Sequence, residues 1–285
     1  MANVLTILWR DLCQPVTDAL RRLGCAVGSR VWWCPGGQLT SLPLHAAGPH
    51  GIDLPGFFDL FVSSYTPSIS SLIAARTIVR DGSEVDERLL LGIGQSDALP
   101  HVKEEVKALQ DIFSDHAFVL DGAAATPSSV LAGLSRYPWV HFACHGSLNP
   151  DLPFECAFEL YGGTMLPLQQ ILQLHLEGRA EGAFLATCHS ASSANAGTPD
   201  EALTLASAMQ FCGFRAVVGS LWAMNDEDGP ALAREYYSHL LNHGAKDCDT
   251  ADVRMSARAL HAAVKSLRDN GLPLHRWATF VHWGV

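Results

Sequence analysis

From residue 88 onward, short apolar runs alternate with segments of helical periodicity, and this alternation constrains the fold more than any other feature of the chain. The apolar runs predict strands at 88–94, 117–120, 139–144, 183–187, 215–221 and 278–283. Helices are expected between them at 102–113, 126–137, 199–212, 231–241 and 251–267. Strand–helix alternation at this spacing predicts an α/β fold, in which helices cover both faces of a mostly parallel sheet.

The first 80 residues follow a different pattern. An apolar stripe predicts a helix over 3–23 that Pro15 should kink or split. Short strands are expected at 31–34 and 57–65, and Pro67 favours a helix over 68–76. Because residues 77–87 have the composition of a linker, the sequence predicts a smaller N-terminal part, 1–80, and a main part, 81–285.

Composition excludes several classes of protein. Hydrophobic residues make up 48% of the 285 residues and charged residues 17%, which predicts a large buried core rather than a disordered chain. The net charge of −10, with no block of Lys and Arg, argues against a nucleic-acid partner. No apolar run reaches the ~18 residues of a membrane span, so no membrane association is predicted.

The cysteines indicate a reducing compartment. The chain has eight of them and no Cys-x-x-Cys pair. The N-terminal segment 3–23 carries charges among its apolar residues, unlike a signal peptide. We therefore expect a cytosolic protein with free thiols.

Two reactive side chains follow two of the predicted strands. His145 comes just after the apolar run 139–144, and Cys188 comes just after 183–187. The carboxyl ends of neighbouring parallel strands share one edge of the sheet, where ligands bind. A histidine and a thiol held together there can serve as base and nucleophile. The pattern predicts a cysteine peptidase.

The chemistry of such a peptidase suggests further residues. Backbone N–H groups of Gly146 and Cys188 are candidates for stabilising the oxyanion, and glycine allows a close approach of the backbone. His145 would protonate the leaving amine. Ser190 begins a run of small residues that suits a loop facing the substrate.

Other interpretations of these residues are weaker. A lone His or Cys at a strand end is usually a packed core residue, and His141, deeper in its strand, fits that description. A zinc site of His141, His145, Cys188 and His189 lacks the usual ligand spacing, so no metal or other cofactor is predicted. The segment around Ser96 resembles a serine nucleophile elbow, but Pro100 interrupts the helix that should follow.

Six segments, in order along nearly the whole chain, match motifs of one family. They are RVWWCPGGQLTSLPL (30–44), VSSYTPSISSL (62–72), HFACHG (141–146), ATCHSA (186–191), the long stretch 199–228 and the ending 277–280. With these segments the chain resembles the CHAT domain, a caspase- and separase-like group of cysteine peptidases.

The resemblance implies a fold, an activity and partners. The fold is a caspase-like three-layer αβα sandwich with a mostly parallel sheet, preceded by a smaller N-terminal α/β part. The activity is that of a cysteine endopeptidase, with a His145–Cys188 dyad and a thioester acyl-enzyme, acting on proteins in a regulated cell-death, immune or signalling pathway. A regulatory or sensor domain or partner is implied as well. The alternative is a catalytically silent member that serves as a scaffold or regulatory protein-binding module.

The resemblance also bears on specificity. In separases, an acidic residue four positions after the Trp of a similar Leu-Trp segment lines the pocket for arginine at P1, the residue before the scissile bond. Here Asp226 follows Trp222 at that spacing, which implies cleavage after basic residues. An unpaired carboxylate in a closed pocket would favour Arg or Lys. The alternative is that Asp226, Glu227 and Asp228 cap the helix that begins near Pro230.

Overall fold

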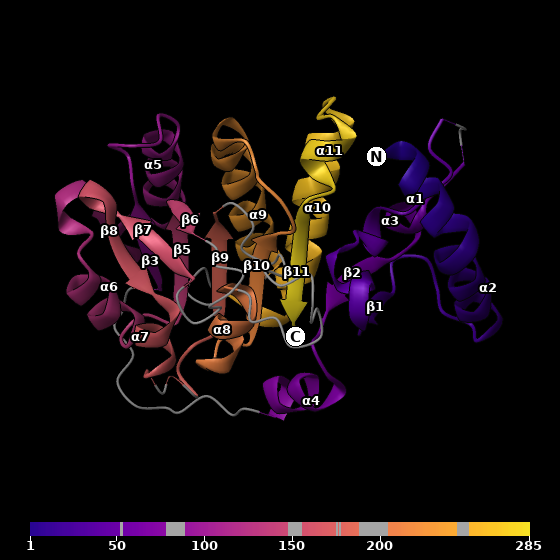
Figure 1. The fold of residues 1–285 in the computed structure, drawn as a ribbon, viewed down its shortest axis with the longest axis horizontal. Helices are drawn as coiled ribbons and strands as arrows, with labels where there is room; N and C mark the ends of the chain where they lie inside the picture. Colours follow the sequence, from indigo (N-terminus) through magenta and orange to yellow (C-terminus); the bar gives the residue numbers. More distant parts are fainter. Residues whose placement is uncertain are drawn as a thin grey trace.

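An eight-stranded sheet forms the centre of the protein (Figure 1). The computed structural model describes residues 1–51, 54–77, 89–147, 156–174, 176, 178–187, 205–243 and 251–285. The sheet has the order β1-β2-β11-β10-β9-β5-β3-β4, and its neighbours are parallel except β10 and β11. Its strands are β1 (Arg30–Trp33), β2 (Val62–Tyr65), β3 (Leu90–Gly94), β4 (Ala117–Asp121), β5 (Trp139–Ala143), β9 (Gly182–Ala186), β10 (Ala216–Ser220) and β11 (Phe280–Gly284). The predicted mostly parallel α/β fold is confirmed.

Helices cover both faces of this sheet. Successive side chains of a strand point to opposite faces, so Leu90 joins one hydrophobic cluster and its neighbour Leu91 joins the other. The Leu90 cluster includes side chains of α5 (Val102–Phe113), α9 (Gly229–His243) and α10 (Ser256–Asp269). The Leu91 cluster includes those of α6 (Pro127–Leu134), α7 (Leu168–Leu172) and α8 (Leu205–Phe211). The result is three layers, as the resemblance implied.

A second, three-stranded antiparallel sheet follows the carboxyl end of β5 (Figure 1). It consists of β6 (His145–Ser147), β7 (Ala157–Leu160) and β8 (Thr164–Pro167). The sequence patterns did not predict this sheet, because its strands are short and one of them follows β5 after a single residue. Its position matters because β6 begins with His145.

The N-terminal helix is interrupted as expected at Pro15. It consists of α1 (Ala2–Leu8), a π-helical turn over Trp9–Cys13 and α2 (Gln14–Arg22). Proline has no N–H and its ring clashes with the carbonyl four residues earlier, so the helix adopts a wider, π-helical turn before it. The interruption changes the hydrogen bonding without ending the helical path.

Only the second half of the strand predicted over 57–65 is confirmed. Residues Phe57–Leu60 form a short helix, α3, and only Val62–Tyr65 form a strand. The Asp59 carboxylate accepts a hydrogen bond from the Gly56 N–H at 2.9 Å, and the Phe61 N–H bonds the Phe57 carbonyl at 3.0 Å. A side chain that caps the first turn stabilises the helix over the extended form.

The N-terminal strands extend the main sheet. Tyr65 of β2 pairs with Trp283 of β11, and β1 pairs with β2 at the edge. The helix predicted over 68–76 is observed as α4 (Ile69–Thr77). The division at residue 80 falls in 78–88, outside the described residues, and stays a prediction.

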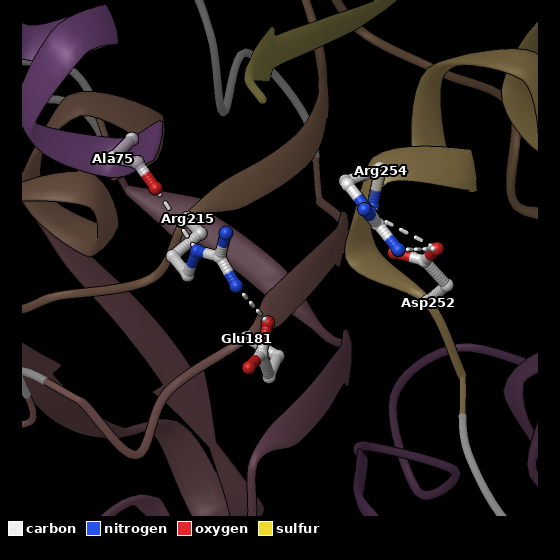
Figure 2. A network of polar contacts seen from close by, with 5 residues as sticks. All are labelled: Ala75, Glu181, Arg215, Asp252 and Arg254. Atoms are coloured by element: carbon white, nitrogen blue, oxygen red, sulfur yellow. Dashed lines mark hydrogen bonds and ion pairs between the residues drawn. The ribbon is translucent and has the colours of Figure 1, made fainter. Parts of the chain in front are cut away.

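Arg215 connects α4 to the amino ends of two central strands (Figure 2). Its guanidinium donates to the Ala75 carbonyl at 2.9 Å and to the Glu181 carboxylate at 3.0 Å. Glu181 directly precedes β9, and Arg215 directly precedes β10. Close by, Arg254 forms an ion pair with Asp252, which lowers the pKa of that carboxyl group. These contacts lie at the rim opposite the strand ends that precede His145 and Cys188.

Three histidines surround a small cavity where the N-terminal part meets α10 and β11. His45, His261 and His282 line this space of about 20 Å³. Burial lowers the pKa of His45 to about 3 and that of His282 well below its usual value. Burial, with a smaller effect of the Arg268 charge, lowers the pKa of His261 to about 4. All three are therefore neutral in the folded protein at neutral pH.

These histidines predict acid sensitivity. A folded protein whose histidines have lowered pKa values binds fewer protons than the unfolded chain, so its stability falls as the pH drops below about 6.5. Each histidine adds a slope of up to about 1.4 kcal/mol per pH unit until its folded pKa is reached. We expect the thermal midpoint to fall between pH 7 and pH 5, and His261→Asn to flatten the decline. Exposed His275→Gln is the control; a midpoint constant over this range would contradict the prediction.

Candidate functional site

Strand register aligns the positions that precede the two predicted catalytic residues. In the β5–β9 pair, Ala143 lies opposite Ala186. His145 and Cys188 each come two residues after these partners. Neighbouring strands lie about 4.8 Å apart, so β5 and β9 end side by side at one rim of the sheet. Cys188 itself, like Ser190, lies outside the described residues.

His145 is the first residue of β6 and stands at the junction of the two sheets. It lies opposite Glu159 of β7, and Gly146 lies opposite Phe158. His145 and Gly146 are both half-buried. The base candidate therefore lies on a paired strand and stays accessible from the rim.

A buried glutamine holds the backbone of His145. Gln95 directly follows β3, and only 1% of its surface is exposed. Its Oε1 accepts a hydrogen bond from the His145 N–H at 3.0 Å. Its Nε2 donates to the Glu159 carboxylate at 3.2 Å and to the Leu160 carbonyl at 3.3 Å. One side chain thus connects the main sheet to two strands of the small sheet.

His141 is a core residue, as its position suggested. Its ring is fully buried and stacks on Phe184, with the ring centroids 4.8 Å apart. Its Nε2 lies 2.8 Å from the Glu105 carboxylate, and its Nδ1 lies 3.1 Å from the Tyr237 hydroxyl. Both ring nitrogens have partners inside the protein, so His141 connects β5 to α5 and α9.

The end of β9 is fixed just before Cys188. The Ser220 hydroxyl, at the end of β10, donates to the Thr187 carbonyl at 2.8 Å. Both side chains are buried, at 1% or less of their surface. This contact continues the β9–β10 pairing beyond the last ladder position and defines where the chain leaves the sheet.

Trp222 follows β10 and is held by the segment before β11. Its backbone N–H donates to the Thr279 hydroxyl at 3.1 Å. Its indole N–H donates to the His275 carbonyl, at 2.9 Å, in the short helix α11 (Leu274–Trp277). Trp222 is half-buried and packs against both hydrophobic clusters.

Asp226 has a partner far away in sequence. Its Oδ2 accepts a hydrogen bond from the His101 N–H at 2.9 Å, and His101 directly precedes α5. A carboxylate at this position stabilises the helix N-terminus. The Asp226 side chain therefore caps α5, which the local sequence did not suggest; capping of the helix near Pro230 by Asp226, Glu227 and Asp228 stays a prediction. Asp228 forms an ion pair with Arg276.

The described residues offer no metal site and no membrane-spanning helix. Within them, no group of three or more His, Cys, Asp or Glu side chains is placed to hold a metal ion. None of the helices described is long and apolar enough to cross a membrane.

Comparison with known families agrees with this architecture. A family model described as the CHAT domain matches residues 3–285. The chain belongs to the CHAT domain family. None of the curated proteins compared with this CHAT domain matches it.

Solved structures of caspase-like cysteine peptidases share the fold of the CHAT domain. The Saccharomyces cerevisiae separase–securin complex matches 86% of this chain and 14% of the separase chain, with 16% identity and a TM-score of 0.57. The Arg-specific cysteine proteinase gingipain R matches 100% of this chain and 67% of its own, with 13% identity and a TM-score of 0.60. A Porphyromonas gingivalis complex of the pro- and mature domains of gingipain RgpB matches with 12% identity, a TM-score of 0.59, and coverage of 100% and 69%. The CHAT domain thus spans a small part of separase and about two thirds of gingipain.

Sequence reasoning missed the role of the turn after β3. From sequence alone, the segment around Ser96 only resembles a serine nucleophile elbow. The Ser96 hydroxyl donates to the Asp121 carboxylate at 2.7 Å, and the Ser96 N–H donates to the same group at 3.1 Å. These bonds explain Ser96 as a residue that fixes the turn. The available signal was a polar Gln-Ser-Asp sequence directly after a buried strand.

Thiol reactivity tests the predicted nucleophile. Burial raises the pKa of Cys13 and Cys212 to about 12 and that of Cys144 further, so these thiols are protonated at neutral pH. We expect iodoacetamide to alkylate Cys188 at pH 7 faster than exposed Cys34, as followed by mass spectrometry of peptides.

The matched control is His145→Ala, which should slow Cys188 to the rate of Cys34 because the thiolate loses its partner. Alkylation of Cys188 no faster than that of Cys34 in the unsubstituted protein would count against an activated thiol.

Proposed function

We propose that this CHAT domain is a cysteine endopeptidase in which His145 and Cys188 act as a dyad. The observation that carries the proposal is the pairing of Ala143 with Ala186, since both candidate residues follow these partners with the same two-residue offset. The shared fold of separase and gingipain supports a peptidase fold. The chemistry at this chain is our inference from the arrangement of the rim.

In the proposed reaction, the Cys188 thiolate attacks the carbonyl carbon of a peptide bond. The thiol proton passes to His145, and the imidazolium later protonates the leaving amine. The C–N bond breaks and a thioester forms. Water, deprotonated by His145, then hydrolyses the thioester and releases the acid product and the thiol.

The oxyanion of this reaction needs backbone donors. The N–H of His145 is already donated to Gln95, so it is not free for the substrate. The N–H groups of Gly146 and Cys188 are our candidates, and glycine lets the substrate approach the backbone closely. Ser190, two residues beyond Cys188, is proposed to face the substrate.

A preference for Arg or Lys at P1 is the second part of the proposal. Asp226 would supply the carboxylate and Trp222 an apolar wall, because both follow β10 at the same rim as β5 and β9. The gingipain match is described as Arg-specific, which supports a basic preference for this fold. The His101 N–H occupies Oδ2 of Asp226, and a carboxylate has further acceptor positions for a guanidinium.

The proposal also includes a regulatory partner and a cytosolic location. The separase match is a complex with securin, and we propose that a regulatory partner or sensor domain likewise controls this protein, in a cell-death, immune or signalling pathway. Free thiols at five of the described cysteines support a reducing, cytosolic location: Cys13, Cys25, Cys34, Cys144 and Cys212.

Cleavage of a proteome-derived peptide library tests the activity. The unsubstituted protein should cut a defined set of peptides, and Cys188→Ala should cut none because the nucleophile is gone. Mass spectrometry of the products gives the cleavage sites. If neither protein cuts, alone or with a cell extract that could supply an activator, a binding module that keeps the fold without catalysis is favoured instead.

Two substitutions of Asp226 separate recognition from helix capping. Asn keeps an oxygen that can accept from the His101 N–H but removes the charge, whereas Ala removes both. If Asp226 binds the basic side chain, Asp226→Asn should lower kcat/KM for Arg substrates by about 10²-fold, roughly the 1.5–3 kcal/mol of a charged hydrogen bond, and leave the melting temperature unchanged. If Asp226→Asn keeps the preference for Arg and Asp226→Ala lowers the melting temperature, Asp226 serves only as a helix cap.

A further inference from the structure

The turn between β3 and α5, residues 95–101, contacts both the strand that begins with His145 and the segment that carries Asp226. Its first residue, Gln95, bonds the backbone of His145, and its last, His101, bonds the carboxylate of Asp226. Between them, Ser96 is held by Asp121 of β4. The turn therefore has fixed contacts on both sides, and it touches the base candidate through a single buried side chain.

The carboxamide of Gln95 matches its surroundings atom by atom. The His145 N–H can only donate, so Oε1 must face it, whereas the Leu160 carbonyl can only accept, so Nε2 must face it. The Glu159 carboxylate takes the second Nε2 proton. The backbone N–H of Gln95 donates to the Ala143 carbonyl at 3.0 Å, which anchors the residue to the end of β5.

Among the protein side chains of this length, only glutamine offers one acceptor and two donors in this arrangement. Glutamate would accept from His145 but would put a second carboxylate against the half-buried Glu159, about 3 Å away. Leucine would leave the N–H of His145 and the carbonyl of Leu160 without partners. The requirement is for an amide, and not only for a buried side chain of the right size.

We propose that Gln95 is the positioning residue of the His145 base, which it aligns by fixing the start of β6 against β7. This inference rests on the proposed function, and it deepens that proposal by naming what holds the base in place. Gln95 touches no substrate because it is buried. It acts only through the backbone position of His145.

The position of the base controls the rate because proton transfer needs hydrogen-bond distance between imidazole and thiol. A displacement of about 1 Å costs up to about 10²-fold in rate. Recognition of the basic side chain is proposed for Asp226 and Trp222, whereas the hydrogen bonds of the Gln95 side chain go to His145, Glu159 and Leu160. Loss of the Gln95 contacts should therefore lower kcat and leave KM nearly constant.

The experiment exchanges the amide and the carboxylate between positions 95 and 159. The variants are Gln95→Glu, Glu159→Gln and the double variant, each assayed for kcat and KM between pH 5.5 and 8.5 on the best library peptide. At pH 8, Gln95→Glu should lose about 10²-fold in kcat, because two carboxylates face each other. The loss should shrink as the pH falls and the pair takes up a shared proton.

The matched controls are the other two variants. Glu159→Gln keeps an acceptor for the Gln95 amide and should lose far less than Gln95→Glu. In the double variant, the carboxylate now at position 95 accepts from His145 and from the amide now at position 159, whereas the Leu160 carbonyl loses its donor. Part of the kcat lost at pH 8 should therefore return. A general loss of stability would move KM as well and would show no reversal with pH.

Two results would overturn the inference. One is a Gln95→Glu protein with wild-type kcat at pH 8. The other is a double variant that is folded, as judged by thermal unfolding, yet has no higher kcat at pH 8 than Gln95→Glu. If Gln95→Glu fails to fold at pH 8, a folded double variant without measurable kcat at this pH would overturn the inference.

Hydrogen exchange of the His145 backbone amide separates this inference from the proposed function. The amide should be protected in the unsubstituted protein and in the double variant, and should exchange faster in Gln95→Glu at pH 8. If the unsubstituted protein cuts no peptide, the proposed function fails, and unchanged exchange in Gln95→Glu would refute the Gln95 contact independently. If the protein cuts peptides but Gln95→Glu cuts equally well, only the inference fails.

Discussion

The parallel pairing of β5 with β9 is the constraint on which the rest of the site depends. Both strands are buried on both faces, so within the sheet they carry side chains of the core. Reactive groups can be placed only after the strands end, and the Ala143–Ala186 register makes both strands end at the same level. Separase and gingipain share this fold at 12–17% identity, which shows that the arrangement of strands tolerates almost complete replacement of the sequence.

Burial of polar groups beneath the rim gives this arrangement its rigidity. His141, Glu105 and Tyr237 form one connected set of contacts between β5, α5 and α9. Gln95 forms another between the two sheets. A buried polar group costs about 1–3 kcal/mol when it lacks a partner, so each set disfavours any alternative register in which its partners separate. The polar residues thus specify one geometry, while the apolar clusters supply most of the stability.

Local patterns predicted the parts of the fold that depend on local physics. The apolar runs predicted the central strands, and the helix predicted over 126–137 is observed as α6, where the Thr126 hydroxyl accepts from the Ser129 N–H. The helix at Phe57 was missed because aromatic residues favour strands and the Asp59 cap outweighs that preference. The small sheet was missed because its strands are short and one of them follows β5 after a single residue. Gln95 was missed because its hydrogen bonds span 50 residues or more, and no local period reports them.

Capping of α5 by Asp226 is compatible with the proposed recognition of a basic side chain by the same carboxylate. Capping and recognition compete only if they need the same oxygen lone pairs, and a carboxylate has about four acceptor positions. The His101 N–H takes one of them, on Oδ2. That bond also fixes the direction of the carboxylate, which reduces the entropy lost when a guanidinium binds. A residue that is already held by the helix N-terminus therefore makes a better specificity residue than a freely rotating one, and α5 carries both this cap and the Glu105 partner of His141.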